Sequence, residues 1–229
     1  MFAHLLPRLE TRWRVISVDL PGHGASPANI DMRDLDAVCA ALRVVAPAPA
    51  AYVGWSMGGL IALAHAARHP ECVTRLLLVA SQPRFMRALD WRHGLAAEAL
   101  DTLHTDLAVN PNTAIARFLS LQVQGAESRQ RALRRLHAVL RAAPPVPAAL
   151  RASLSLLRDT DLRAALPELL RPVRLILGER DRLVSARAGA AVMRLSRHAR
   201  CEIIQGAGHV PFLSHADAFA RALYMYLDD

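Results

Sequence analysis

A serine, an aspartate and a histidine at three distant points of the chain are the residue types of a catalytic triad. Ser56 is the centre of Gly54–Gly58, which reads Gly-x-Ser-x-Gly. Asp181 ends the turn-like run Gly178–Asp181, and His209 follows a glycine in a later loop. A serine hydroxyl becomes a good nucleophile only when a base removes its proton and an acid orients and stabilises that base. We therefore predict that Ser56 is the nucleophile, His209 the base and Asp181 the acid.

The residues around Ser56 fit a nucleophile elbow, the sharp strand-to-helix turn that presents a catalytic serine. The apolar run 50–53 predicts a strand, and the run 60–67 predicts a helix. The helix dipole and the free N–H groups at such a helix start favour developing negative charge. The turn is tight, so we expect a Cβ atom at Gly54 or at Gly58 to collide with a neighbouring element.

Other residues compete for these roles. Glu179 lies two residues nearer its strand than Asp181 and is the rival acid. Asp19 could be catalytic, but we expect its carboxylate to bind amides of the loop that follows it. His65 and His69 are four residues apart on a helix, as a metal pair would be. No third ligand lies nearby in the sequence, so we interpret them as surface or packing histidines.

The elements that must position these residues alternate between strand and helix. We expect strands at 12–19, 50–53, 73–80, 173–177 and 201–204, and core helices at 31–45, 60–68, 186–198 and 216–227. This alternation predicts an α/β fold with a mostly parallel sheet flanked by helices. Ser56, Asp181 and His209 each follow a strand, so all three would meet at the carboxyl edge of the sheet.

Between about 82 and 165 the strand signals stop. Helical candidates there are 91–104, 113–124, 128–141 and 148–158. We predict a core of 1–81 and 166–229, with 82–165 as a helical cap inserted over the active edge. Basic residues concentrate in this insertion, and such a one-sided charge favours either a solvated face or an acidic partner. These residues are Arg117, Arg129, Arg131, Arg134, Arg135, Arg141 and Arg151.

Composition excludes some classes of function. The 28 basic residues are all arginine, with a net charge of +8, so lysine Schiff-base chemistry is excluded. No nucleic-acid-binding motif accompanies the charge, and no apolar run reaches the ~20 residues of a transmembrane helix. Three scattered cysteines in 229 residues indicate free thiols in a reducing cytoplasm. We expect a cytoplasmic monomer with no metal, cofactor, nucleic-acid or membrane partner.

Several motifs identify a family resemblance that covers nearly the whole chain. The chain resembles the α/β-hydrolase superfamily, and within it the family of pimeloyl-[acyl-carrier protein] methyl ester esterases of biotin synthesis. The Ser, Asp, His order is that of α/β-hydrolases. The tryptophan before the serine and the Phe-Leu-x-Leu-Gln stretch narrow the resemblance from the superfamily to this esterase family. The stretches that carry it are 19–26, 54–59, 69–71, 79–81, 117–122 and 208–215.

The resemblance implies a serine carboxylesterase that removes the methyl ester from a pimeloyl group held on acyl carrier protein. It also implies a substrate channel lined by Trp55, Met57, Phe118, Leu119, Ser120, Leu121 and Gln122. The Met57 N–H would be one oxyanion donor, and no cofactor would be needed. Arg117, Arg129 and Arg134 are similar to the cap arginines that contact the acidic carrier protein.

One feature departs from the family pattern. The second oxyanion donor in such enzymes comes from a His-Gly loop after an earlier strand. Neither that strand nor that loop stands before Phe2, so we expect the first strands to be missing, through a start codon placed too late rather than a true loss. Losing one donor costs on the order of 10²–10³ in rate. One alternative function is a general small-ester carboxylesterase. Another, owing to the missing oxyanion loop, is a catalytically impaired, hydrolase-like binding protein.

Overall fold

The computed structural model describes residues 2–46, 49–126 and 129–228. The strands are β1 (Ala50–Trp55), β2 (Val73–Val79), β3 (Val173–Gly178) and β4 (Ala199–Ile204). The helices before the long insertion are α1 (Leu6–Leu9), α2 (Leu35–Val45) and α3 (Met57–Arg68). The insertion holds α4 (Ala97–Val109), α5 (Pro111–Gln122), α6 (Arg129–Ala142) and α7 (Pro147–Asp159), and α8 (Arg187–Leu195), α9 (Pro211–Ser214) and α10 (Ala216–Asp228) follow. Short 3-10 turns occupy Pro70–Cys72 and Arg163–Ala165.

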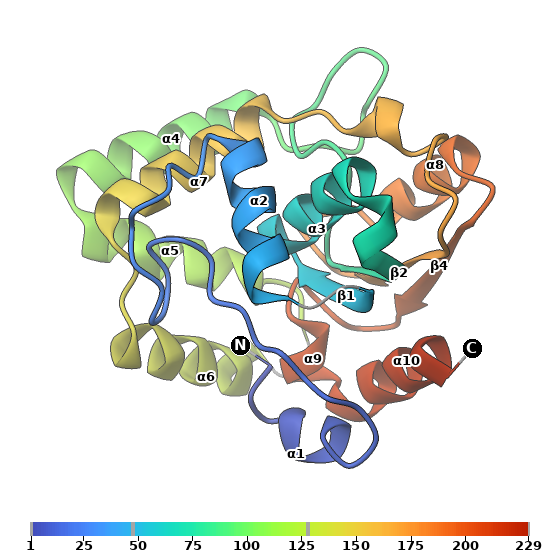
Figure 1. Ribbon diagram of the computed structural model, residues 1–229. Coiled ribbons are helices and arrows are strands. Elements are labelled where there is room, and N and C mark those ends of the chain that lie inside the picture. Colours follow the sequence, from blue (N-terminus) through green and yellow to red (C-terminus); the bar gives the residue numbers. More distant parts are fainter. Residues whose placement is uncertain (1, 47–48, 127–128, 229) are drawn as a thin grey trace.

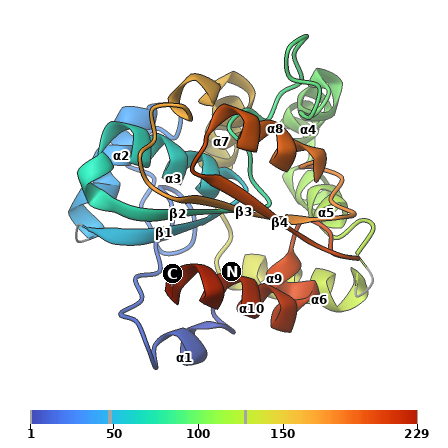
Figure 2. The same ribbon diagram turned by 90° about the vertical axis from the view of Figure 1, so that its right-hand side faces the viewer.

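The strands form one parallel sheet in the order β1-β2-β3-β4. Figure 2 shows helices on both sides of this sheet, with α3 and α8 on one side and α9 and α10 on the other. Parallel strands need helical crossovers, so both faces of the sheet are covered. The sheet is therefore the middle layer of an α/β sandwich, as the alternation of elements predicted.

The strand β2 shows how one sequence serves both faces. Its residues Leu76 and Leu78 belong to the apolar cluster that contains Leu60 and Leu63 of α3. The intervening Leu77 belongs to the opposite cluster, which contains residues of α9 and α10. Successive strand side chains point to opposite faces, so a continuous apolar run is what a doubly covered strand requires. The strand is therefore packed against an apolar layer on each face of the sheet.

The strand expected at 12–19 is wrong. Residues 14–20 form no regular element, and Ile16 and Val18 are 40% and 42% exposed. A strand exists only where a neighbour completes its backbone hydrogen bonds. Among the described residues β1 pairs with β2 alone, and the segment 14–20 pairs with no strand. The β-branched pattern is present, but the sheet has no adjacent partner for it.

The insertion between β2 and β3 is helical. Figure 1 shows α4, α5, α6 and α7 gathered beside the core (green to yellow). The segments that lead into and out of it are joined, because Arg84 pairs with Asp161 across 2.6 Å and the Leu162 N–H donates to the Pro83 carbonyl. The division into a core and a cap at 82 and 165 stays a prediction.

The helix expected from Trp91 begins instead at Ala97. Trp91 lies in a turn before the helix. Its indole N–H donates to the Arg84 carbonyl at 2.9 Å, and its backbone forms an isolated bridge with Ala88. The other insertion helices agree with expectation to within about two residues, the usual uncertainty of helix ends. Ser128, the expected start of one of them, lies outside the described residues.

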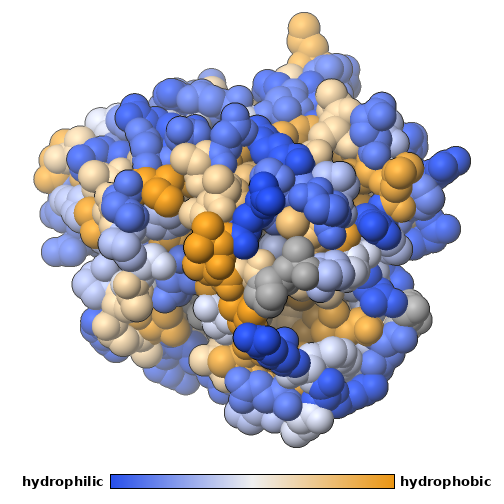
Figure 3. Space-filling model, viewed as in Figure 1, coloured by the Kyte–Doolittle hydropathy of each residue, from blue (hydrophilic) through white to orange (hydrophobic). Residues whose placement is uncertain are grey.

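Within the described part of the chain, no helix has both the length and the apolar character to cross a membrane. In Figure 3, hydrophilic residues cover most of the visible face, with hydrophobic residues interspersed in small groups.

Candidate active site

Ser56 lies on the tight turn between β1 and α3. Its φ of 53° and ψ of −122° place a non-glycine residue in a strained region of backbone conformation. Its N–H donates to the Val79 carbonyl at the end of β2, and its carbonyl accepts from Gly59 and Leu60 in the first turn of α3. Hydrogen bonds to β2 and to α3 thus stabilise the strained backbone conformation of Ser56. The side chain is partly exposed, so a substrate can reach the hydroxyl.

The glycines of the elbow differ in what they do. A Cβ at Gly54 would lie 2.4 Å from the Gly58 carbonyl oxygen, and one at Gly59 would lie 2.5 Å from the Ser81 Cβ. A Cβ at Gly58 would meet nothing within 4 Å. The expected collision is therefore confirmed at Gly54 and wrong at Gly58. The close approach falls at Gly59 instead, because that residue faces the chain leaving β2.

His209 and Asp181 complete a continuous chain of hydrogen bonds with Ser56. The His209 Nε2 lies 2.9 Å from the Ser56 Oγ, and the His209 Nδ1 lies 2.8 Å from the Asp181 Oδ2. His209 is 1% exposed and Asp181 8% exposed. In such a buried position a carboxylate fixes the tautomer of the imidazole and stabilises the imidazolium that forms when the serine is deprotonated. The arrangement can therefore activate a serine hydroxyl.

The two candidate acids have separate positions. The Asp181 Oδ1 accepts from the N–H groups of Leu183 and Val184, at 2.8 and 3.0 Å, which leaves Oδ2 for the imidazole. The rival, Glu179, accepts from the Gly206 N–H at 2.9 Å. Glu179 therefore holds the loop that carries His209, whereas Asp181 contacts the imidazole itself.

The Met57 N–H, which we expect to be an oxyanion donor, lies in the first turn of α3. Met57 is the first residue of the helix, so its N–H has no carbonyl four residues earlier within the helix to bind. It adjoins Ser56 and points from the positive end of a twelve-residue helix. Developing negative charge on a carbonyl oxygen attacked by Ser56 would be stabilised there.

The expected channel residues do not share one environment. Trp55, Met57, Phe118 and Ser120 are partly exposed. Leu119 is buried at 2% in the apolar cluster that includes Leu136 of α6. Leu121 is 43% exposed, and Gln122 is 5% exposed. A helix cannot aim five consecutive side chains at one cavity, since each residue turns about 100° from the last.

The basic residues of the insertion fall into two groups. Arg117 on α5 pairs with Asp106 on α4 at 2.7 Å, so its charge is balanced locally. Arg129, Arg131, Arg134, Arg135 and Arg141 are exposed on α6, and Arg151 is exposed on α7. The sequence of α6 contains no acidic residue, so this helix presents a one-sided positive face.

Two residues considered from the sequence have structural roles. The Asp19 carboxylate accepts from the Ala25 N–H at 3.0 Å, which confirms that it holds its own loop. His65 is fully buried, and its ring lies 5.0 Å from those of Tyr52 and His69. Burial is the main cause that lowers the pKa of His65, which favours the neutral form of a packing residue.

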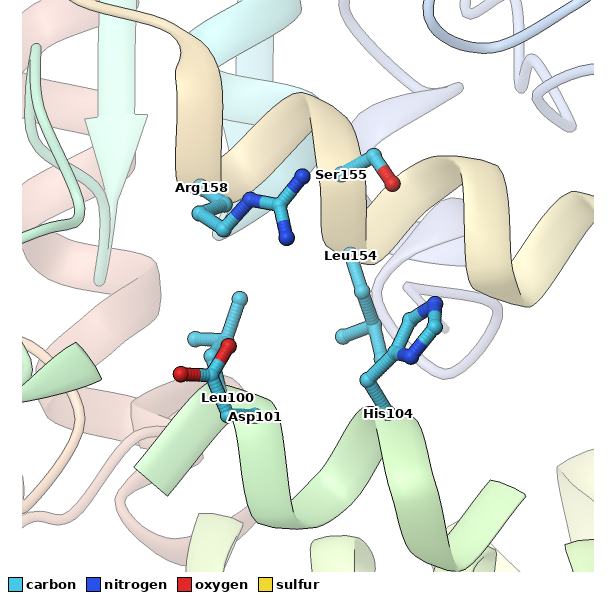
Figure 4. A pocket seen from close by; sticks show the side chains of 6 residues that line it. All are labelled: Leu100, Asp101, His104, Leu154, Ser155 and Arg158. Carbon is cyan, nitrogen blue, oxygen red and sulfur yellow. The ribbon is translucent and has the colours of Figure 1, made fainter. Parts of the chain in front are cut away.

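A small pocket between α4 and α7 contains the same residue types as the triad. Figure 4 shows Asp101 and His104 on α4, and Ser155 and Arg158 on α7, with the Arg158 side chain directed toward α4. Its volume of about 10 Å³ holds roughly one water molecule. None of Ser56, Asp181 and His209 lines it. The candidate active site is therefore the elbow, not this pocket.

Comparisons with known proteins agree with this geometry. The model of a family described as the alpha/beta hydrolase family matches residues 1–222. Over 228 residues the chain is 42% identical to a pimeloyl-[acyl-carrier protein] methyl ester esterase of Xanthomonas oryzae, covering 99% of this chain and 89% of the relative. A protein of the same name from Stenotrophomonas maltophilia is 40% identical, with 99% and 87% covered.

Solved structures show the same fold. An esterase from Exiguobacterium antarcticum superposes with a TM-score of 0.90 at 23% identity, covering 100% of this chain and 87% of that one. An enol-lactonase from Burkholderia xenovorans gives a TM-score of 0.86 at 21% identity, with 100% and 86% covered. At these identities the likeness concerns the fold alone.

Proposed function

Because the chain belongs to the α/β-hydrolase family, we propose that it is a serine carboxylesterase acting through Ser56, His209 and Asp181. The observation that carries this proposal is the hydrogen-bond chain from the Ser56 hydroxyl through the imidazole to the carboxylate. The same arrangement on unrelated folds performs acyl transfer by one mechanism.

The reaction follows from the positions of these atoms. The Ser56 Oγ attacks the ester carbonyl while the His209 Nε2 takes its proton. The Met57 N–H stabilises the oxyanion of the tetrahedral intermediate. His209 then returns the proton to the departing alcohol, and an acyl-serine remains. Water, deprotonated by His209, attacks this acyl group. The imidazolium then returns the proton to the Ser56 Oγ as the acyl–serine bond breaks and the free acid leaves. The Asp181 carboxylate stabilises the imidazolium in both halves of the reaction.

The substrate we propose is the methyl ester of a pimeloyl group carried on acyl carrier protein, so that methanol is the first product. Relatives named pimeloyl-[acyl-carrier protein] methyl ester esterase match almost the whole chain at 40–42% identity. The positive face of α6 supports an acidic protein partner. The cysteines are free thiols, which supports a reducing, cytoplasmic compartment.

Two measurements test the proposal. The first is labelling by a fluorophosphonate, which should modify Ser56 in the wild type and leave Ser56→Ala unlabelled. The second compares kcat/KM for methyl pimeloyl-carrier protein with that for short p-nitrophenyl esters. A clear preference for the carrier-bound ester is expected. Preference for the free esters would indicate a general carboxylesterase, and a folded protein without a Ser56 adduct would indicate a binding protein.

A further inference from the structure

The backbone of His209 is held from two directions. Its carbonyl accepts a hydrogen bond from the Trp55 indole Nε1–H at 2.8 Å. Its N–H donates to the Gln122 carbonyl at 3.2 Å. Trp55 is the last residue of β1 and adjoins Ser56. The strand that leads to the nucleophile is therefore hydrogen-bonded to the loop that carries the base. We propose that Trp55 is a positioning residue, which sets the distance between the His209 imidazole and the Ser56 hydroxyl.

The loop that carries His209 is anchored before the histidine by the Glu179 carboxylate at Gly206 and by the Arg180 N–H at the Ala207 carbonyl, and Trp55 anchors residue 209 itself. The loop leaves β4 at Ile204 and contains Gly206, with a φ of 71°, and Gly208 immediately before the histidine. Glycine restricts its own backbone less than other residues do, so the local sequence defines the place of residue 209 only loosely. The bonds from Asp181 and Ser56 act on the ring. The bond from Trp55 acts on the backbone to which that ring is attached.

The Trp55 ring strengthens the same contact. Its centroid lies 5.6 Å from that of the His209 ring, and 5.4 Å from that of Phe212 in an edge-to-face arrangement. Phe212 is fully buried and belongs to the cluster under α9 and α10. The indole thus packs against Phe212 of the core and against the His209 ring. An indole packed on both sides can hold the carbonyl of His209 in one place.

The bond to Gln122 connects the insertion to the same point. Gln122 is the last residue of α5, and the carbonyls of a helix end need partners outside the helix. One of them binds the N–H of the catalytic histidine. A side-chain substitution at Gln122 would leave this backbone bond in place, so Trp55 is the residue at which the proposal can be tested.

The positioning role makes a different kinetic prediction from channel lining, the role that the family resemblance implies for Trp55. A lining residue changes KM and the preference for acyl length. A positioning residue changes the rate of every step in which His209 moves a proton, by a factor that does not depend on the acyl group. This inference rests on the proposed esterase function.

The decisive variant is Trp55→Phe, which retains an aromatic ring beside Phe212 and loses the indole N–H. Trp91→Phe is the matched control, because it removes an equivalent bond of 2.9 Å from an indole to the Arg84 carbonyl, away from the triad.

We expect Trp55→Phe to lower kcat by roughly 10- to 100-fold, the scale on which a small misplacement of a catalytic group acts. KM should stay within about twofold, and the factor should be equal for acetyl, butyryl and hexanoyl p-nitrophenyl esters. The rate of fluorophosphonate labelling should fall by the same factor, whereas Trp91→Phe should keep the wild-type kcat.

Phenylalanine is also smaller than tryptophan, and this could lower kcat by itself. Replacing Trp55 with 3-benzothienylalanine separates the two effects, because this residue has the shape of tryptophan without its N–H. It should reproduce the loss of kcat, whereas 5-fluorotryptophan, which retains the N–H, should restore the wild-type value. A factor that depends on acyl length, or wild-type kcat and labelling rate in both N–H-deficient variants, would overturn the proposal. Failure of the esterase function itself is distinguishable, because the wild type would then neither label nor hydrolyse any ester.

Discussion

The Arg84 Nη1 lies 2.6 Å from the Asp161 Oδ2, and this pair joins the chain entering the helical insertion to the chain leaving it. Asp161 also accepts from Arg163, which pairs with Asp90 at 3.0 Å and lies over the Trp91 ring. The base of the insertion is thus closed by ionic and cation–π contacts around one carboxylate. These contacts join the two ends of the insertion to each other.

We expect Asp161→Asn to destabilise the protein. Burial acts to raise the pKa of Asp161, but hydrogen bonds from Arg163 and Arg84 outweigh it and lower the pKa to about 2. A lowered pKa means stability that is present above the unfolded value of about 4 and is lost as pH falls toward 2. Urea unfolding at pH 7 should show a loss of about 2 kcal/mol, and this loss should shrink by roughly 1 kcal/mol at pH 3. Asp31→Asn, which breaks an exposed pair with Arg33, is the control and should change little. A pH-independent difference between wild type and Asp161→Asn would contradict the assignment.

The acid of the triad can be identified by two amide substitutions. Asp181→Asn should lower kcat by about 10⁴-fold, because an amide favours the wrong tautomer of the imidazole. Glu179→Gln should keep kcat within a few-fold, since an amide oxygen can still accept from the Gly206 N–H. Steady-state kinetics on a p-nitrophenyl ester measures both. The reverse order of effects would move the acid to Glu179.

The elbow glycines should respond differently to alanine. Gly54→Ala and Gly59→Ala place a Cβ within 2.6 Å of neighbouring heavy atoms, so we expect each to unfold or strongly destabilise the protein. Gly58→Ala enters open space in the first turn of α3 and should raise stability by up to about 1 kcal/mol. Thermal unfolding followed by circular dichroism separates the cases. A fall in the melting temperature of Gly58→Ala to that of the other two would refute this account of the turn.

The α6 arginines should matter only for a carrier-bound substrate. Arg129→Glu and Arg134→Glu should each raise KM for methyl pimeloyl-carrier protein by about 5- to 10-fold and weaken its dependence on salt, as expected for exposed charges that steer association. Kinetics on p-nitrophenyl esters should not change. Arg117→Gln is the matched variant on α5, and it should have a smaller effect because Asp106 already balances that charge. Equal effects of the α6 variants on carrier-bound and free esters would rule out a docking role.

The sequence by itself determined the local features of this protein. The apolar runs 73–80 and 173–177 predict buried strands, and Gly-x-Ser-x-Gly between a strand and a helix predicts the elbow. The Ser, Asp, His order after separate strands placed the triad, because parallel strands deliver their carboxyl ends to one edge. The inferences about strands and elbow each depend on a period or a motif contained within a few residues, and the inference about the triad depends on the order of such motifs along the chain.

Only the tertiary structure decided the features that depend on a neighbour distant in sequence. The segment 12–19 has the composition of a strand, yet strand formation needs an adjacent strand to complete its hydrogen bonds. Whether Gly58 or Gly59 needs its small size depends on where Ser81 lies. The contact of Glu179 with Gly206 joins segments 27 residues apart, and the bond from Trp55 to His209 joins segments 154 residues apart. Such contacts join residues that no local pattern links, so packing of the sheet and helices is what sets them.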